Sequence, residues 1–384
     1  MPRQEVPPAP PNPPPEAPPE APPGALVPGV RLAEFEIERV LGVGGFGIVY
    51  LAFDHVLHRR VAIKEYMPAA LAARARDATV TVHSGAQAAT FAAGLQSFIT
   101  EARLLARFDH PALVKVHRFW EANGTAYMVM PWYAGRPLNE ISADMAQPPD
   151  EAWLRRLVDP LLEALELLHR DGVYHRDISP DNILLLPDGS PVLLDFGSAR
   201  KVIGDRTQML TAVLKPKFAP VEQYADVPGM RQGPWTDLYA LGAVVRYLLS
   251  REAPMPAVMR AVRDTMCPLS QGAAPAGVSG RFLAVIDWTM SVEPEGRPQD
   301  VAALRDALDG RREPPPAWQP HPVAEAPPPS AETPTAPSQA WPATVSMTQP
   351  VMQPMPQPMP EQAPAAPEQQ QFQPQPEFPG QPQE

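Results

Sequence analysis

The sequence contains almost no cysteine: Cys267 is the only one among 384 residues. A single cysteine cannot form an intramolecular disulfide, and it lacks the neighbouring cysteine that structural zinc sites use. The eight histidines show no metal-ligand spacing either. We therefore expect neither a disulfide framework nor a zinc site, and a reducing compartment, the cytoplasm, is the predicted location.

Long apolar runs and an excess of positive charge are also missing. A membrane-spanning helix needs about 20 apolar residues, and the most apolar helical stretch, DLYALGAVVRYLL, is interrupted by Arg246. The N-terminus has no apolar core of the kind found in signal peptides. The net charge is -11, and no basic stretch dominates. The sequence therefore predicts no membrane span, no signal peptide and no nucleic-acid partner.

Proline is present in excess, with 55 residues, most of them near the two ends. Residues 1–29 consist mainly of Pro, Ala and Glu, and residues 313–384 are rich in Pro, Gln, Ala and Met. Such segments bury too little apolar surface to offset the entropy of ordering, so both are predicted to be disordered tails. Their PxxP-type spacing suits partner binding, but the composition alone produces it. Partners of the tails and inert spacers therefore both remain open.

The first part of residues 30–312 shows strand patterns. Apolar residues flank a glycine turn within 35–54, and further strands are expected over 59–67 and 125–133. One helical period interrupts them at 95–108, after an Ala-rich segment, 68–94, that is predicted to be irregular.

The second part is mainly helical. Residues 150–172 form a predicted amphipathic helix, with Asp150 as its N-cap and Gly172 as its stop. Two short strands are expected before Asp195, and mostly helix after it. The pattern predicts a two-lobe α+β protein, with an antiparallel-sheet small lobe over 30–133, a helical large lobe over 134–312, and a cleft between them.

The glycine turn has the spacing G-x-G-x-x-G at Gly42, Gly44 and Gly47. Glycines let a backbone approach phosphates closely and point N–H groups at them. The same spacing in a dinucleotide-binding fold opens a helix, whereas a strand follows here. The pattern therefore favours a lid over a nucleotide between two antiparallel strands.

Two charged residues and two polar motifs complete the pattern. Lys64 ends the apolar stretch Val-Ala-Ile-Lys, and Glu101 lies close in phase to the apolar stripe of the predicted helix. Taken singly, either is more typical of a solvated surface residue. The polar motifs are HRD…N, from His175 to Asn182, and Asp-Phe-Gly from Asp195, followed by Ala-Pro and a nearby glutamate.

These motifs, in this order, resemble those of the eukaryotic-like (Hanks-type) serine/threonine protein kinases. The resemblance covers residues 35–312, and the wording KEYMP, HRDISPDNIL, FAPVEQY and QGPWTDLYALGA is similar to a bacterial branch. It implies the bilobal protein-kinase fold, flanked here by the disordered Pro-rich tails.

The resemblance also implies roles for individual residues. Lys64 binds the α and β phosphates of ATP and Glu101 orients it, while Asp177 accepts or orients the proton of the substrate hydroxyl. Asn182 and Asp195 bind Mg²⁺, with Mn²⁺ as an alternative metal. The residues implied in ATP binding are Leu41, Gly42, Gly44, Gly45, Gly47, Val49, Ala62, Lys64, Met130, Trp132 and Leu184.

Further residues match supporting positions of the family. Asp237 is expected to brace the catalytic loop, and Glu222 to pair with Arg297 in spite of the extra Val221. Thr207 and Thr211 are candidate autophosphorylation sites, which Arg176 and Arg200 would bind once they are phosphorylated.

The sequence departs from the family at two places. Ser179 stands where a lysine usually reaches the γ-phosphate, and LKPKF precedes Ala219 where a Gly-Thr pair is usual. Lys215 or Lys217 is a candidate to supply the missing charge; the alternative is that both are solvated. Because tyrosine kinases also lack that lysine, a tyrosine or dual specificity stays open beside Ser/Thr.

The predicted function is ATP-dependent phosphorylation of Ser and Thr hydroxyls of proteins, including the kinase's own activation loop. The alternative is a pseudokinase or scaffolding module that binds nucleotide without transferring phosphate. The presence of Lys64, Asp177, Asn182 and Asp195 together favours an active enzyme.

Overall fold

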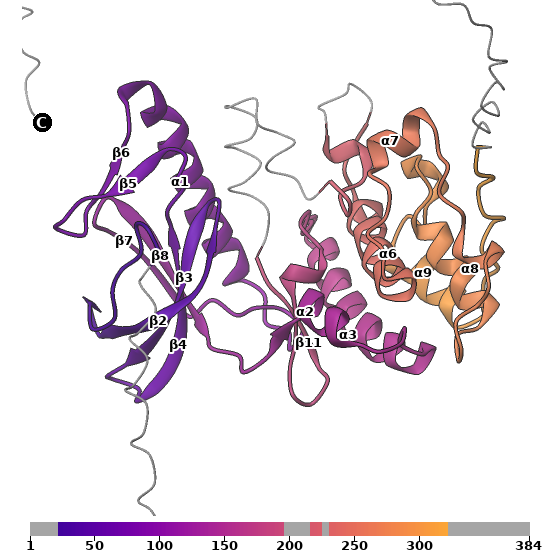
Figure 1. The fold of residues 1–384 in the computed structure, drawn as a ribbon, viewed down its shortest axis with the longest axis horizontal. Helices are drawn as coiled ribbons and strands as arrows, with labels where there is room; N and C mark the ends of the chain where they lie inside the picture. The colour runs from indigo at the N-terminus through magenta and orange to yellow at the C-terminus, as the bar shows by residue number, and fades with distance from the viewer. Residues whose placement is uncertain (1–21, 196–215, 225–229, 322–384) are drawn as a thin grey trace, which may run out of the picture. The chain divides into compact units, whose positions relative to one another are not determined.

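A computed structural model describes residues 22–195, 216–224 and 230–321 (Figure 1). The candidate phosphorylation sites Thr207 and Thr211 lie outside the described residues, as do Arg200 and Lys215.

The small lobe is built on a six-stranded antiparallel sheet with the strand order β1-β2-β3-β4-β8-β7. Its strands are β1 (Arg31–Leu32), β2 (Phe35–Gly44), β3 (Gly47–Asp54), β4 (Arg59–Tyr66), β7 (Arg118–Ala122) and β8 (Thr125–Pro131). The predicted strands are confirmed, and the β2–β3 turn falls at Gly45 and Phe46. A side chain at Gly47 would come within 2.3 Å of the Glu65 carbonyl oxygen, so this close approach requires glycine.

The prediction of an irregular segment over 68–94 is wrong. This segment forms a hairpin, β5 (Ala72–Arg74) and β6 (Val80–Val82), and then the first turns of α1 (Gly85–Leu105), which begins ten residues before the predicted helix. Alanine is a strong helix former but leaves no large apolar residue to mark the helical period. The added turns are fixed by Phe91, whose carbonyl accepts a hydrogen bond from Tyr66 at 3.1 Å.

The large lobe is mainly helical, as predicted (Figure 1). Its helices are α2 (Leu138–Asp144), α3 (Glu151–Arg170), α6 (Pro234–Ser250), α7 (Ala257–Val262), α8 (Gly280–Thr289) and α9 (Val301–Leu308), with the 3-10 turns η1 (Pro180–Asn182), η2 (Val221–Gln223), η3 (Leu269–Gln271) and η4 (Pro294–Gly296). A small sheet joins β9 (Arg136–Pro137), β10 (Ile183–Leu185) and β11 (Pro191–Leu193). Asp150 caps α3 through the Trp153 amide at 2.8 Å, and Gly172 ends it with a φ of 68°.

The packed chain starts earlier than the predicted boundary at residue 30. Leu26 is 2% exposed, and its N–H donates to the Tyr50 hydroxyl at 3.1 Å. Arg74 donates to the Gly24 carbonyl at 2.7 Å and forms an ion pair with the buried Glu65. A single leucine in a Pro-rich segment does not change its average composition, which is why the sequence boundary falls too late.

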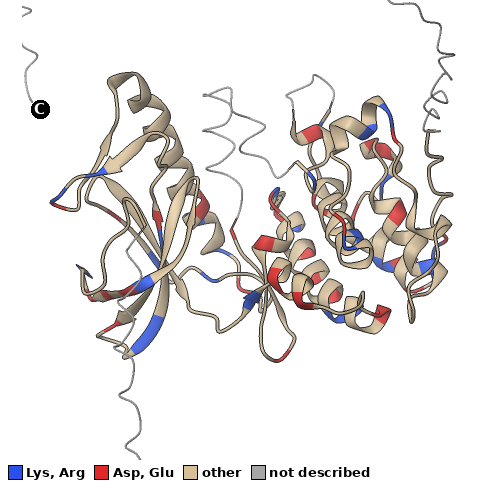
Figure 2. Ribbon diagram, viewed as in Figure 1, with Lys and Arg blue, Asp and Glu red and all other residues tan. Residues whose placement is uncertain are grey.

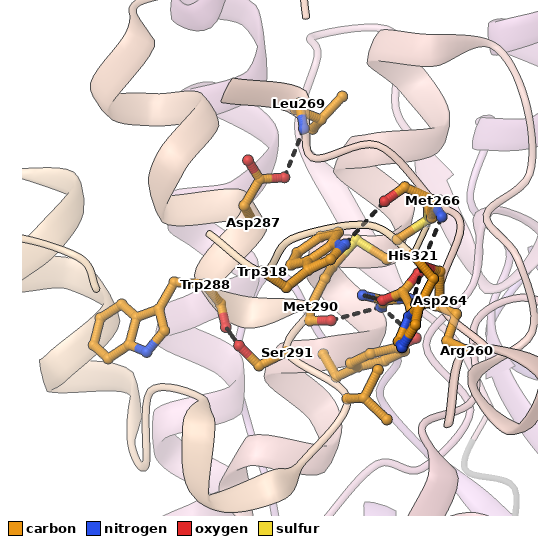
Figure 3. A network of polar contacts seen from close by, with 12 residues as sticks. Arg260, Asp264, Met266, Leu269, Asp287, Trp288, Met290, Ser291, Trp318 and His321 are labelled. Atoms are coloured by element: carbon orange, nitrogen blue, oxygen red, sulfur yellow. Dashed lines mark hydrogen bonds and ion pairs between the residues drawn. The ribbon is translucent and has the colours of Figure 1, made fainter. Parts of the chain in front are cut away.

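The packed chain also continues past the predicted boundary at residue 312 (Figure 3). The Trp318 indole N–H donates to the Met266 carbonyl at 2.9 Å, and its ring lies 4.4 Å from the guanidinium of Arg260. The His321 N–H donates to the Asp264 carbonyl at 2.6 Å. We call residues 318–321 the C-terminal anchor.

Within the described residues, no helix is long and apolar enough to cross a membrane. Figure 2 shows basic and acidic segments interspersed along the described parts of both lobes.

Candidate active site

The register of the small-lobe sheet brings several of the predicted nucleotide-binding residues onto one face. Val49 pairs with both Gly42 and Lys64, and Ala62 pairs with Met130. Directly opposite residues of antiparallel strands project from the same face, as do alternate residues of one strand. The residues that this register places on a common face are Gly42, Val49, Ala62, Lys64 and Met130.

Lys64 meets two carboxylates from distant parts of the chain. Its ammonium nitrogen lies 2.8 Å from Asp195 Oδ1 and 3.5 Å from Glu101 Oε1. The side chain of Glu101 is 1% exposed, and this burial raises the pKa of Glu101 to about 7 even though the charge of Lys64 lowers it. The structure thus brings together three of the predicted site residues.

The loop over residues 173–182, which carries the HRD…N motif and is called the catalytic loop below, is bonded to helix α6 through Asp237, as predicted. The two carboxylate oxygens of Asp237 accept the backbone N–H groups of His175, at 2.9 Å, and Arg176, at 2.8 Å. Burial alone would raise the pKa of Asp237, but the hydrogen bond and charge of His169 and the loop N–H groups outweigh it, so the pKa is lowered. The carboxylate stabilises Arg176 in a left-handed conformation with a φ of 65°.

His175 connects the two predicted catalytic aspartates. Its Nε2–H donates to the Leu194 carbonyl at 2.6 Å, directly before Asp195, and its Nδ1 accepts the Asp177 N–H at 3.3 Å. Both bonds require the same neutral tautomer. Burial lowers the pKa of His175, which favours that neutral ring.

Asn182 contacts Asp177 directly. Its side-chain nitrogen donates to the Asp177 backbone oxygen at 2.7 Å and to Asp177 Oδ2 at 2.6 Å. Because the nitrogen is used in this way, the side-chain oxygen of Asn182 remains available as a ligand. Together with the Asp195 carboxylate it makes two oxygen donors.

Residues 216–224, the first described segment after residue 195, are bonded to the large lobe. Arg297 binds Glu222 through two nitrogens, at 2.7 and 3.1 Å, and both side chains are fully buried. Thr236 donates its hydroxyl to the same carboxylate at 2.9 Å. The predicted pairing of Glu222 with Arg297 is therefore confirmed, and the extra Val221 is accommodated in η2.

The two departures from the family pattern lie in different surroundings. Ser179 is completely buried at the start of η1, whereas Lys217 is exposed.

Reasoning from the sequence missed His169, whose Nε2 lies 2.8 Å from Asp237 Oδ2. A polar residue among the leucines of α3 was a signal for it. No pattern marked Gln223, whose side chain donates to the Arg176 carbonyl at 2.7 Å.

Comparison with known proteins shows the family to which this chain belongs. Residues 35–307 match the protein kinase domain. The chain belongs to the protein kinase family. The family match ends before the C-terminal anchor.

Two relatives of this chain come from bacteria. It is 30% identical over 288 residues to "Serine/threonine-protein kinase PknB" of Mycobacterium leprae (strain TN), which covers 71% of this chain and 42% of the relative. It is equally similar to "Serine/threonine-protein kinase pkn2" of Myxococcus xanthus, with 71% and 32% covered. The kinase thus spans less than half the length of these two curated relatives.

A solved structure described as "PpkA-294 apo form" is 49% identical to this kinase, with a TM-score of 0.70. The match covers 74% of this chain and 99% of that one. The protein-kinase fold expected from the sequence is confirmed, with its antiparallel-sheet small lobe and helical large lobe.

Proposed function

We propose that the chain is an active kinase that transfers the γ-phosphate of ATP to Ser or Thr hydroxyls of proteins. Membership of the family implies ATP, a divalent metal and protein substrates in general terms. The observation that carries the finer proposal is the position of the Lys64 ammonium between Glu101 and Asp195, on the same sheet face as the glycine turn. An ammonium placed in this way can bind nucleotide phosphates.

The residues of the catalytic loop take the acid–base role. The hydroxyl oxygen of the acceptor forms a bond to the γ-phosphorus, and its proton passes to the Asp177 carboxylate. The bond from the γ-phosphorus to the bridging oxygen breaks, and its electron pair leaves with ADP. Asn182 and His175 orient Asp177 for this step through the contacts described above.

Asn182 and Asp195 fit a metal that is shared with the nucleotide. The described residues contain no cluster of three or more His, Cys, Asp or Glu able to bind an ion unaided. Mg²⁺ is commonly bound by one or two protein oxygens together with phosphate oxygens and water, which suits these two side chains. When bound there, Mg²⁺ or Mn²⁺ would offset negative charge on the β and γ phosphates.

Transfer of labelled γ-phosphate to a generic protein acceptor tests the proposal. We expect label on Ser or Thr, and its loss in Asp177→Asn without loss of nucleotide binding. Asp188→Asn is the matched control, because Asp188 is exposed and accepts the Ser190 N–H in the β10–β11 turn. Label on Tyr would change the acceptor class. Nucleotide binding without any transfer would contradict the proposal.

We also propose that the kinase phosphorylates itself at Thr207 or Thr211, as the exposed and left-handed Arg176 is near the segment that follows them. Mapping of phosphopeptides from an active preparation tests this. If neither threonine is modified, the idea is wrong.

The reducing cytoplasm remains the proposed location. The proposed domain is residues 22–321, which includes the packed residues near each end of the lobes.

A further inference from the structure

Gln223 forms a direct link between the segment at 216–224 and the backbone of the catalytic loop. Its side-chain nitrogen donates to the Arg176 carbonyl oxygen at 2.7 Å. The nitrogen must face this carbonyl, because the side-chain oxygen is also an acceptor and would repel it. The Arg176 carbonyl carbon is bonded to the nitrogen of Asp177. Gln223 therefore fixes the peptide plane that leads into the catalytic aspartate.

The two peptide planes of Arg176 are bound by different elements. Asp237 of α6 accepts the Arg176 N–H, and Gln223 of η2 donates to its carbonyl oxygen. Arg176 has a positive φ of 65°, which costs free energy in a residue with a side chain. Such a conformation persists when its surroundings determine it from several sides. One bond comes from α6 in the large lobe, and the other comes from η2 in the segment at 216–224.

The residues on both sides of Gln223 are held by hydrogen bonds. Its neighbour Glu222 is 1% exposed and binds both Arg297 and Thr236, and Tyr224 donates its hydroxyl to the Pro216 carbonyl at 2.6 Å. The amide of Gln223 thus extends from a fixed backbone. It lines a small pit together with Asp177, Phe218 and Ala219.

We propose that Gln223 is a positioning residue that sets Asp177 in register with the segment at 216–224. The inference rests on the proposed kinase activity, because the residue positioned is the group that receives the hydroxyl proton. In this proposal Gln223 acts only through the Arg176 carbonyl, and not on the nucleotide or the metal. Its loss therefore slows transfer and leaves nucleotide binding as it was.

The first variant is Gln223→Met, which keeps the length of the side chain and removes the donor. We expect kcat to fall about tenfold, the factor that corresponds to one hydrogen bond of about 1.4 kcal/mol, with the KM for ATP unchanged and the melting temperature lowered no more than in the control variant. Gln299→Met is the matched control. Gln299 also donates to two backbone carbonyls, those of Pro294 and Arg297 at 2.9 Å, neither of which belongs to residues 173–178.

The second variant is Gln223→Glu, which adds a pH readout. An ionised glutamate has no proton to donate and faces the Arg176 carbonyl with a charge, so its kcat should lie below that of Gln223→Met. Once protonated, the carboxyl can donate again. The kcat of Gln223→Glu divided by the kcat of Gln223→Met should therefore rise as the pH falls. A merely structural loss gives a ratio that does not change with pH.

Hydrogen exchange of residues 173–178 separates this inference from the proposed function. Gln223→Met should speed exchange in this stretch, and Gln299→Met should not. If the parent protein transfers no phosphate, the proposed function fails, but the exchange result still decides whether Gln223 constrains the loop. Unchanged exchange, an unchanged kcat in Gln223→Met, or a ratio that is flat with pH would each overturn the inference.

Discussion

The ammonium nitrogen of Lys64 lies closer to Asp195 than to Glu101, at 2.8 Å against 3.5 Å. The two acids differ in their surroundings, because the side chain of Glu101 is 1% exposed and that of Asp195 is 25% exposed. Under the proposed function, phosphates that bind Lys64 would therefore compete with the accessible Asp195 carboxylate, while Glu101 stays buried. The protonation of Glu101 then decides how firmly Lys64 is oriented.

Nucleotide affinity should depend on pH through Glu101. Burial raises its pKa to about 7, so the folded protein takes up a proton there as the pH falls through neutrality. A neutral Glu101 attracts Lys64 less, so affinity should weaken from about pH 8 to about pH 6. Titration with a fluorescent nucleotide measures this. Glu101→Gln should bind weakly and lack that part of the pH dependence; equal slopes in both proteins would contradict the assignment.

The stability of the fold should show the same titration with the opposite sign. An unfolded glutamate loses its proton near pH 4.5, and the folded one near pH 7. Raising the pH through this window therefore destabilises the folded state relative to Glu101→Gln. Chemical denaturation of both proteins at pH 5 and pH 8 checks the sign, and a parent protein that gains stability relative to the variant on going to pH 8 would refute it.

Asp237→Asn should destabilise the large lobe. The substitution removes a charge that accepts two loop N–H groups and His169 in a fully buried site. We expect a loss of about 3 kcal/mol in the free energy of unfolding, since a bond to a charged group contributes about 1.5 to 3 kcal/mol. Asp171→Asn is the control, because its pair with Arg107 is exposed and contributes under about 1 kcal/mol. Equal effects of the two variants would argue against the buried network.

Alanine at both Lys215 and Lys217 tests whether these lysines replace the charge that Ser179 cannot supply. If they do, kcat should fall at least about tenfold with ATP affinity nearly unchanged, because the missing charge acts on the transferred phosphate. Lys115→Ala is the control, since Lys115 is a surface residue paired with Asp109. Full turnover in the double variant would mean that both lysines are merely solvated.

The C-terminal anchor should contribute to stability. Trp318→Ala removes both the indole hydrogen bond and the ring beside the buried Arg260, and we expect a loss of about 2 kcal/mol. Trp318→Phe keeps a ring and should lose only about half as much. Denaturant titration measures both, and an alanine variant as stable as the parent would show that the anchor only rests on the surface.

The sequence predicted what short patterns encode. The glycine turn and the strand that ends at Lys64 carry their own spacing, and the phase of one helix selected Glu101. The early turns of α1 were missed because alanine supports a helix without marking its period. Gln223 and Trp318 could not be found in this way, since each bonds to a residue about fifty positions away. Such contacts follow only from the folded chain.

The C-terminal anchor also has a mechanical consequence. Any force that reaches the domain along the chain beyond residue 321 acts first on the bonds of His321 and Trp318 to the segment at 264–266. These bonds lie beyond α9 in the chain, so they must break before the last helix is loaded. Whatever is attached downstream therefore acts on the lobe through Asp264 and Arg260, and the helices behind them are protected from the pull.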